Sequence, residues 1–185
     1  MNNFNLDDIL GFELEESIEN LTLAQCELLR DRGISRYSAS SYLTPFRVKS
    51  IEDLLLMGTY NDLGGVEVIT LDGDRVLFGE RDITTLQGRE EELIICQDMF
   101  CFLSLVELGI YRDQSAIILH DDTMMANAMI TIHDEYSHAR ITAYFDHTVS
   151  GKSSFENLKS CFKKIIDGSP FYLDYENVND YIMSR

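Results

Sequence analysis

Three histidines in the second half of the chain stand close to carboxylates, a combination that binds zinc and moves protons. His133 and His138 enclose the sequence Asp-Glu-Tyr-Ser, and His120 is followed directly by Asp121 and Asp122. If a turn separates His133 from His138, the two rings face each other, and His120 or Asp121 would complete a zinc site. The five-residue spacing differs from that of the HExxH zinc motif. The sequence therefore predicts no bound metal, and a small metal-dependent enzyme using His120, His133 and His138 is a lesser alternative.

Other catalytic patterns are absent from the sequence. It contains no G-x-S-x-G nucleophile motif, no G-x-G-x-x-G and no P-loop. The cysteines have no C-x-x-C spacing and lie in apolar helical segments, which predicts reduced, buried thiols; they are Cys26, Cys96, Cys101 and Cys161. We therefore expect no enzymatic activity and no cofactor.

The composition is strongly acidic, with 32 Asp and Glu against 15 Lys and Arg in 185 residues and a formal net charge of −17. Direct nucleic-acid binding is disfavoured because the phosphate backbone requires cationic contacts. An acidic surface suits a basic protein partner. No apolar run reaches the roughly 18 residues that span a bilayer, and the first residues lack the pattern of a secretory signal. We therefore expect a cytoplasmic protein that binds neither membranes nor nucleic acids.

A hairpin followed by a long helix is expected to position the rest of the chain. Alternating β-branched and aromatic residues at 66–70 and 76–78 flank an Asp-Gly pair at 72–73, which is typical of a tight turn because glycine adopts positive φ easily. Apolar residues at helical spacing then predict a buried helix from Arg89 that ends at Gly109.

Two more helices are predicted from capping boxes, in which a hydroxyl residue is followed three positions later by Glu or Gln. One begins at Thr22 and ends before Gly33, and the other begins at Ser153 and ends before Gly168. Between the first of these helices and the hairpin, Pro45 argues against a central strand because proline cannot donate to a sheet.

Three strand candidates follow the long helix at residues 115–120, 126–133 and 139–145, with acidic pairs at their joints that suggest an antiparallel meander. The predicted fold class is α+β, an antiparallel sheet of about five or six strands with helices packed on it. The predicted organisation is a single domain over residues 1–185, and three of its segments are less regular: a possible acidic arm at 1–20, a helix or strand at 50–57, and an acidic-aromatic tail at 171–185.

Three stretches resemble SUKH-superfamily immunity proteins. The capped helix at 21–45 with its Gly-Ile-Ser turn, the segment 57–79 around the Asp-Gly turn, and the small residues at 149–155 follow the order of parts in that family. The chain departs from the family pattern at Ser35, where proline is usual, and in having no tryptophan.

The resemblance implies a single α+β domain that neutralises a bacterial toxin, often a nuclease or deaminase, by occluding its active site. A basic toxin domain would be the cognate partner, as in toxin-antitoxin pairs, with acids steering association and aromatic residues anchoring it. The candidate partner-binding residues are the acids and tyrosines expected at loop ends and in the tail: Asp121, Asp122, Asp134, Glu135, Tyr136, Asp174, Tyr175 and Glu176. The main alternative is a phage or plasmid anti-defence protein that mimics DNA with rows of carboxylates.

Overall fold

The structure is a computed structural model that describes residues 13–18, 20–49 and 54–185. The chain divides into two compact units, which are described separately below. The first consists of the residues up to Asp31 together with Ser35–Arg81, and the second of Arg32–Ile34 together with Asp82–Arg185. Whether they act as the single predicted domain stays a prediction. No helix among the described residues is long and apolar enough to cross a bilayer.

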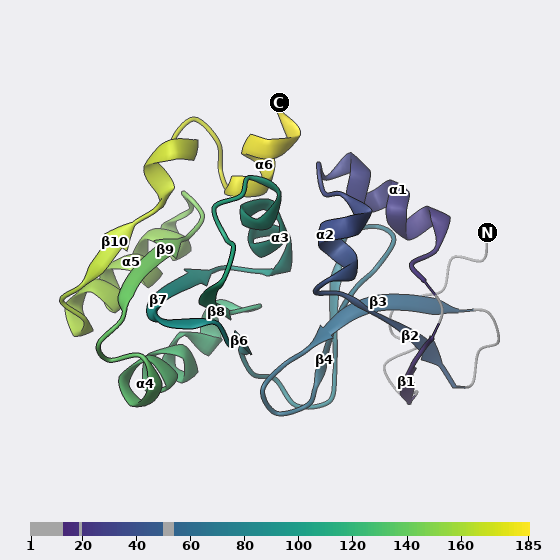
Figure 1. The fold of residues 1–185 in the computed structure, drawn as a ribbon, viewed down its shortest axis with the longest axis horizontal. Coiled ribbons are helices and arrows are strands. Elements are labelled where there is room, and N and C mark those ends of the chain that lie inside the picture. The colour runs from purple at the N-terminus through teal and green to yellow at the C-terminus, as the bar shows by residue number, and fades with distance from the viewer. Residues whose placement is uncertain (1–12, 19, 50–53) are drawn as a thin grey trace. The chain divides into compact units, whose positions relative to one another are not determined.

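The first unit contains one antiparallel sheet with strand order β1-β2-β3-β4-β5 and two short helices (Figure 1). Its elements are β1 (Leu14–Glu16), α1 (Leu23–Asp31), α2 (Arg36–Ser40), β2 (Thr44–Val48), β3 (Leu55–Tyr60), β4 (Val66–Ile69) and β5 (Arg75–Phe78). The predicted antiparallel sheet of about five strands is therefore confirmed.

Local sequence signals account for much of this unit. Thr22 and Gln25 form the predicted capping box, in which each backbone N–H donates to the other's side chain, at 2.8 and 3.2 Å. Gly73 has φ of 84° in the turn between β4 and β5, as the Asp-Gly pair predicts. The expectation for Pro45 is wrong, because it lies in β2 between two partner strands and its carbonyl accepts from Ser17.

The second unit is a mostly parallel sheet with helices, and its strand order is β10-β9-β7-β8-β6. Strands β7, β8, β9 and β10 run parallel, and β6 pairs antiparallel with β8. Its elements are β6 (Thr84–Leu86), β7 (Arg89–Cys96), α3 (Met99–Glu107), β8 (Gln114–Ile118), η2 (Asp122–Met124), α4 (Met125–Glu135), β9 (Arg140–Tyr144), α5 (Val149–Cys161), β10 (Ile165–Asp167), η3 (Ser169–Tyr172) and α6 (Val178–Met183).

The α+β class is confirmed, but the predicted meander is not. Residues 126–133 belong to α4, and the N-terminal half of the helix predicted from Arg89 is strand β7. A strand that is buried on both faces in a parallel sheet is continuously apolar, so periodicity alone does not separate it from a buried helix. Helix α5 begins at Val149 with Thr148 as its cap, so the predicted start at Ser153 lies one turn too late.

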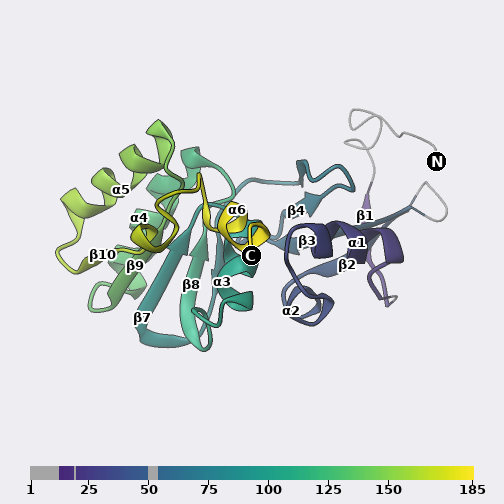
Figure 2. The same ribbon diagram turned by 90° about the horizontal axis from the view of Figure 1, so that it is seen from above.

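Helices α4 and α5 cover one face of the parallel sheet. Residues of β7, β8 and β9 pack there against Ala128 and Ile132 of α4 and against Leu158 of α5, all fully buried. Figure 2 shows these strands side by side in the second unit. The tail docks on this unit, because Tyr172 is 1% exposed and donates a hydrogen bond to the Phe145 carbonyl at 2.8 Å.

Two expectations fall partly outside the described residues. Residues 1–12 and 19 of the acidic arm are not described, and Leu14–Glu16 form β1. Residues 50–53 are not described either, and the rest of the 50–57 segment leads into strand β3.

Candidate active-site crevice

The loops that follow β7, β8 and β9 meet at the carboxyl edge of the parallel sheet. From β7 the chain passes through α3 to β8 on one side, and it then returns through α4 to β9 on the other side of β7. The connection after β7 leads to β8 and the connection after its neighbour β9 leads to β10, in opposite directions across the sheet. The carboxyl ends of β7 and β9 therefore form a topological switch point, where open α/β sheets bind ligands. We therefore take this edge as the candidate site.

The loop after β7 contributes Gln97 and Asp98. Asp98 caps α3, and its carboxylate accepts a hydrogen bond from the Cys101 backbone N–H at 2.9 Å. The Cys101 thiol is buried and donates to the Tyr144 carbonyl, and burial raises its pKa well above the ordinary value. Cys101 is therefore a packing residue and not a nucleophile at neutral pH.

The loop after β8 is joined to the other two loops through Asp122. The Gln97 side-chain amide donates to one Asp122 carboxylate oxygen, and the Ser150 hydroxyl donates to the other. The Asp121 carboxylate instead accepts hydrogen bonds within its own loop, from the Thr123 backbone N–H at 2.9 Å and from the Thr123 hydroxyl at 2.6 Å. Asp122 thus fixes the positions of the β7 loop and the start of α5 at once.

The loop after β9 carries Asp146, His147 and Thr148. Thr148 caps α5 by accepting from the Gly151 N–H at 3.0 Å. Gly151 is needed there, since a Cβ atom on it would lie 2.2 Å from the backbone oxygen of Asp146. The close approach places the first turn of α5 directly over Asp146.

A second set of contacts holds His147. Its Nδ1–H donates to the Tyr175 carbonyl at 2.7 Å, its backbone N–H donates to the Glu176 carbonyl at 2.7 Å, and its ring lies 5.0 Å from that of Tyr172. Since Nδ1 must be the donor, neutral His147 presents Nε2 as an acceptor, and this atom is covered and has no partner among the described residues.

Asp98 and Asp146 line one small cavity of about 50 Å³ together with Arg32 and Asn179. Asn179 is 4% exposed and donates to the Arg32 carbonyl and the Ser104 hydroxyl, both at 2.9 Å, while its own oxygen has no partner in the described chain. Within the described residues, no group of three or more His, Cys, Asp and Glu side chains is arranged to hold a metal ion. Asp98 and Asp146 bring two carboxylates to this cavity, the ligand type that hard cations such as magnesium prefer.

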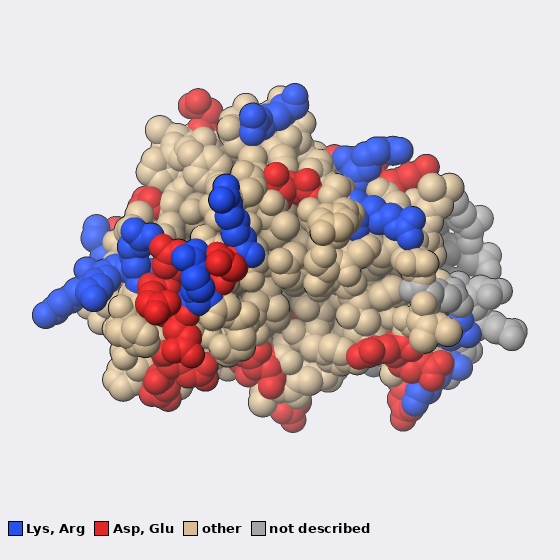
Figure 3. Space-filling model, viewed as in Figure 1, with Lys and Arg blue, Asp and Glu red and all other residues tan. Residues whose placement is uncertain are grey.

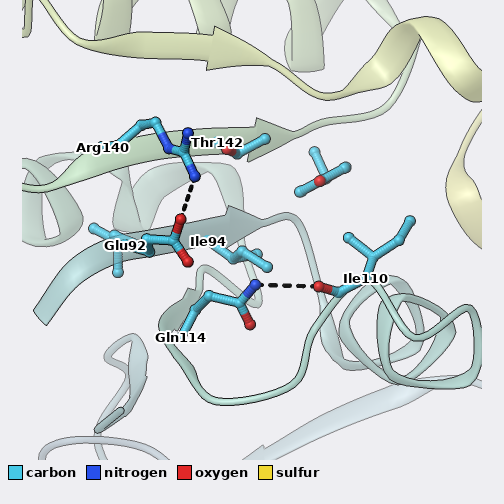
Figure 4. A pocket seen from close by; sticks show the side chains of 8 residues that line it. Glu92, Ile94, Ile110, Gln114, Arg140 and Thr142 are labelled. Carbon is cyan, nitrogen blue, oxygen red and sulfur yellow. Dashed lines mark hydrogen bonds and ion pairs between the residues drawn. The ribbon is translucent and has the colours of Figure 1, made fainter. Parts of the chain in front are cut away.

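Two further cavities differ in size and place. A groove of about 470 Å³ runs between α5 and η3, with the loop after β9 as its floor. The other cavity measures about 70 Å³ and lies on β7 and β9, where Arg140 forms an ion pair with Glu92, and Gln114 donates to the Ile110 carbonyl at 3.2 Å (Figure 4). That cavity is too small for more than a few waters.

The histidines of the lesser alternative, a metal-dependent enzyme, are not brought together. His120 is 6% exposed at the carboxyl end of β8, where Nε2 lies 2.7 Å from the Thr84 hydroxyl oxygen. His133 is exposed near the end of α4 and contacts Asp134, and His138 follows that helix. Since α4 runs from the carboxyl edge of the sheet to the opposite edge, His133 and His138 lie at the far end from His120.

The predicted partner-binding residues are also divided between the two edges. Asp121 and Asp122 lie in the crevice loops, and Asp174, Tyr175 and Glu176 follow η3, next to His147. Asp134 and Glu135 lie at the end of α4. Tyr136 is 1% exposed and its hydroxyl donates to Gln87 at 3.1 Å, so it is a core residue. As a protein-binding set these residues stay a prediction.

Charges are mixed on the face of the molecule that Figure 3 shows, with basic groups projecting where Figure 1 places α5 and β10. The sequence explains this cluster, because four of the five lysines lie in residues 152–164. The acidic net charge therefore does not describe every surface of the chain.

The fold is similar to that of solved primase fragments. One solved structure, the primase fragment of the bacteriophage T7 primase-helicase protein, matches with a TM-score of 0.66 and 14% identity over 99% of this chain and 74% of that chain. A chain from a complex of the T7 lagging-strand DNA polymerase with primase domains, bound to an RNA/DNA hybrid and dTTP, matches with a TM-score of 0.61 and 12% identity over 99% of this chain and 91% of that chain. No protein-family model and no curated protein matches the sequence.

These matches overturn the functional expectations from the sequence. The interpretation as an immunity protein with a basic toxin partner is wrong, and so are the expectations that the chain is not an enzyme and does not bind nucleic acid, because the shared fold is that of primase domains. The anti-defence alternative falls with them. The SUKH resemblance itself is not tested by these structures.

Sequence reasoning missed Gln97, Asp98 and Asp146 as site residues. Asp146 lies one residue beyond the alternating strand Arg140–Tyr144, and small residues at 150–151 follow it at the start of a helix. A polar residue between a strand and a helix start is the available signal, but it becomes informative only once the strands are known to be parallel.

Proposed function

We propose that this chain is a primase-type nucleotidyltransferase domain, which joins ribonucleotides on a single-stranded DNA template. The observation that carries the proposal is the likeness to phage primase fragments across both units, over 99% of the chain. The position of the crevice supports the proposal, because open α/β sheets bind ligands at the switch point. Asp98, Asp122 and Asp146 come from three loops at that point of this sheet.

The chemistry requires little covalent participation by the protein. The 3′-hydroxyl of one nucleotide attacks the α-phosphate of the next, a phosphodiester bond forms, the hydroxyl proton passes to solvent, and pyrophosphate leaves. Asp98 and Asp146 would hold magnesium, which neutralises the charge that develops on the phosphates. The chain's part is to position these carboxylates, through the α3 cap at Asp98 and the close approach of Gly151 to Asp146.

The test is primer synthesis by the purified chain on single-stranded DNA templates of mixed sequence, with labelled ribonucleoside triphosphates and Mg²⁺. A net charge of −17 predicts weak template affinity, because like charges repel the phosphate backbone, while local cationic contacts to the template weaken as salt is added. The assay is therefore run over a range of ionic strengths. We expect short RNA products that require both the template and Mg²⁺.

A matched pair of variants separates this activity from contamination. Asp146→Asn should lower the rate by about 100-fold, as loss of a charged group from a phosphoryl-transfer site does. Asp134→Asn makes the same chemical change at the opposite edge and should leave the rate unchanged. Equal product from both variants, or no product on any template, would overturn the proposal.

A further inference from the structure

The groove between α5 and η3 has the size of a small-ligand site. Its volume of about 470 Å³ lies within the range of roughly 300–1,000 Å³ that is usual for such sites. Helix α5 forms one wall, Pro170 and Leu173 belong to the other, and Phe145 and His147 form the floor. The groove adjoins the crevice, since Asp146 lines both the groove and the small cavity beside Asp98.

One face of α5 presents both cationic and aromatic groups to this groove. Lys152, Phe155 and Lys159 follow helical spacing, so the two lysines belong to one face of α5, with Cα atoms about 10 Å apart along the axis. The Lys159 ammonium lies 5.7 Å from the centre of the Phe155 ring. The Phe155 ring and Leu173 offer apolar surfaces against which a flat base can pack. Lys152 lies near the positive N-terminal end of the 13-residue helix α5, where phosphates are favoured.

The floor adds a polar feature that the fold leaves unsatisfied. His147 is held by the Tyr175 and Glu176 carbonyls, and its Nε2 acceptor lacks a partner among the described residues. A buried acceptor without a partner costs free energy, so a donor that reaches it is favoured. Because Nε2 is covered, a ligand N–H or O–H reaches it only after the side chains around it shift. Nucleotides carry such donors on both the base and the ribose.

The charge of the lining separates a mononucleotide from a nucleic-acid strand. Asp146, Glu156 and Asp167 line the same groove as the two lysines, so the lining as a whole is slightly acidic. A strand that tracks a groove needs a continuous cationic path, which these acids interrupt. A mononucleotide needs cations only at its phosphate end.

We propose that this groove binds a nucleotide as a mononucleotide, with the phosphates at Lys152 and the base against Phe155. The proposal rests on the proposed function for the identity of the ligand and goes beyond it in naming a site outside the crevice. The nucleotide would enter beside Asp146, the carboxylate that the groove shares with the crevice.

The experiment measures equilibrium binding of a fluorescent ATP analogue, mant-ATP, to the full chain without template DNA. The Lys152→Ala/Lys159→Ala variant should weaken binding about tenfold or more. The Lys163→Ala/Lys164→Ala variant makes the same charge change at exposed positions outside the groove, so its affinity should equal that of the unchanged chain. Circular dichroism of both variants confirms that each is folded.

Photolabelling locates the ligand directly. With 8-azido-ATP, the labelled peptide should come from the groove lining, residues 145–173, and labelling should fall when Leu173→Trp fills the groove from its exposed wall. Labelling only at residues 97–101, or equal mant-ATP affinity of the two lysine variants, would overturn the groove assignment. The assignment is also wrong if the Lys152→Ala/Lys159→Ala variant binds a ten-nucleotide oligo(dT) more weakly than the unchanged chain does but binds mant-ATP equally well.

The two proposals fail in different ways. Primer synthesis together with equal mant-ATP affinity of the two lysine variants leaves the proposed function intact and overturns the groove assignment. Lysine-dependent mant-ATP binding without primer synthesis on any template leaves the groove intact and removes the proposed function. If mant-ATP does not bind at all, the groove assignment falls, whatever the synthesis assay shows.

Discussion

Gly151 lies so close to Asp146 that a Cβ atom in its place would come within 2.2 Å of the Asp146 backbone oxygen and 2.9 Å of its nitrogen. These distances are below any ordinary contact of a Cβ atom, and both neighbours are backbone, which cannot move aside as a flexible side chain does. The first turn of α5 and the loop that carries Asp146 are therefore coupled in position.

Gly151→Ala should destabilise the chain because the clash forces α5 or the Asp146 loop to shift. We expect the free energy of unfolding to fall by about 1–3 kcal/mol, the usual cost of overpacking. Urea denaturation measures it. Ser153→Ala lies in the same helix at an exposed position and should change stability little. Equal stability of the two variants would show that the close approach is not present in solution.

The parts of the fold that the sequence predicts depend on short-range signals. The Thr22–Gln25 capping box and the Asp-Gly turn of the β4–β5 hairpin each act within four residues, and both form as expected. The sequence-based predictions for strand β7 and helix α4 are wrong because the burial of these elements is set by distant partners. Residues Leu93–Cys96 are apolar in sequence whether they form a strand or a helix.

The candidate site depends on topology, and so the sequence alone does not reveal it. Gln97 and Ser150 lie 25 and 28 residues from Asp122 in the sequence, and the three meet only because β8 and β9 run parallel to β7 on either side of it. An antiparallel meander would have placed the end of the second of these strands at the opposite edge. The alternative in which His120 joins His133 and His138 at a zinc site fails for the same reason, because helix α4 and not a strand precedes His138.

Tyr172 makes stability sensitive to alkaline pH. Burial raises the pKa of Tyr172 above its ordinary value, so the folded chain keeps the phenol proton at a pH where the unfolded chain, with a pKa of about 10, loses it. The unfolded state then binds fewer protons, and the free energy of unfolding falls as pH rises above about 10. This one group contributes a slope of up to about 1.4 kcal/mol per pH unit.

Tyr172→Phe tests this dependence. The variant loses the hydrogen bond to the Phe145 carbonyl, so at pH 8 it should be less stable by about 1 kcal/mol. Between pH 10 and 11 its stability should fall less steeply than that of the unchanged chain. The raised pKa of the buried Cys101 thiol also makes stability fall as pH rises. Because Cys101 is present in both proteins, its contribution to the slope cancels in the comparison. Tyr37→Phe, at an 86% exposed position, should leave the slope unchanged.

The four cysteines should differ in reactivity according to burial, and not behave as the uniformly buried set that the sequence predicts. All four are free; Cys96 and Cys101 are buried, Cys26 is partly buried and Cys161 is exposed. Ellman's reagent at pH 8 should modify one thiol rapidly, and Cys161→Ser should abolish that phase. Cys96 and Cys101 should react only after unfolding in denaturant. A rapidly reacting thiol in a Cys26→Ser/Cys161→Ser variant would contradict the burial of Cys96 and Cys101.

The hydrogen bond from Gln97 to Asp122 can be tested by exchanging donor and acceptor. Gln97→Glu places two carboxylates against each other in a partly exposed contact, and it should lower the free energy of unfolding at pH 7 by about 1 kcal/mol. Because one partner is exposed, added salt should recover part of the loss. In Gln97→Glu/Asp122→Asn the asparagine amide donates to the new carboxylate, and its oxygen still accepts from Ser150. The double variant should therefore regain most of the lost stability. If the loss of unfolding free energy in the double variant equals the sum of the losses in the two single variants, the two side chains are not coupled. The three loops of the crevice are then not held together through Asp122.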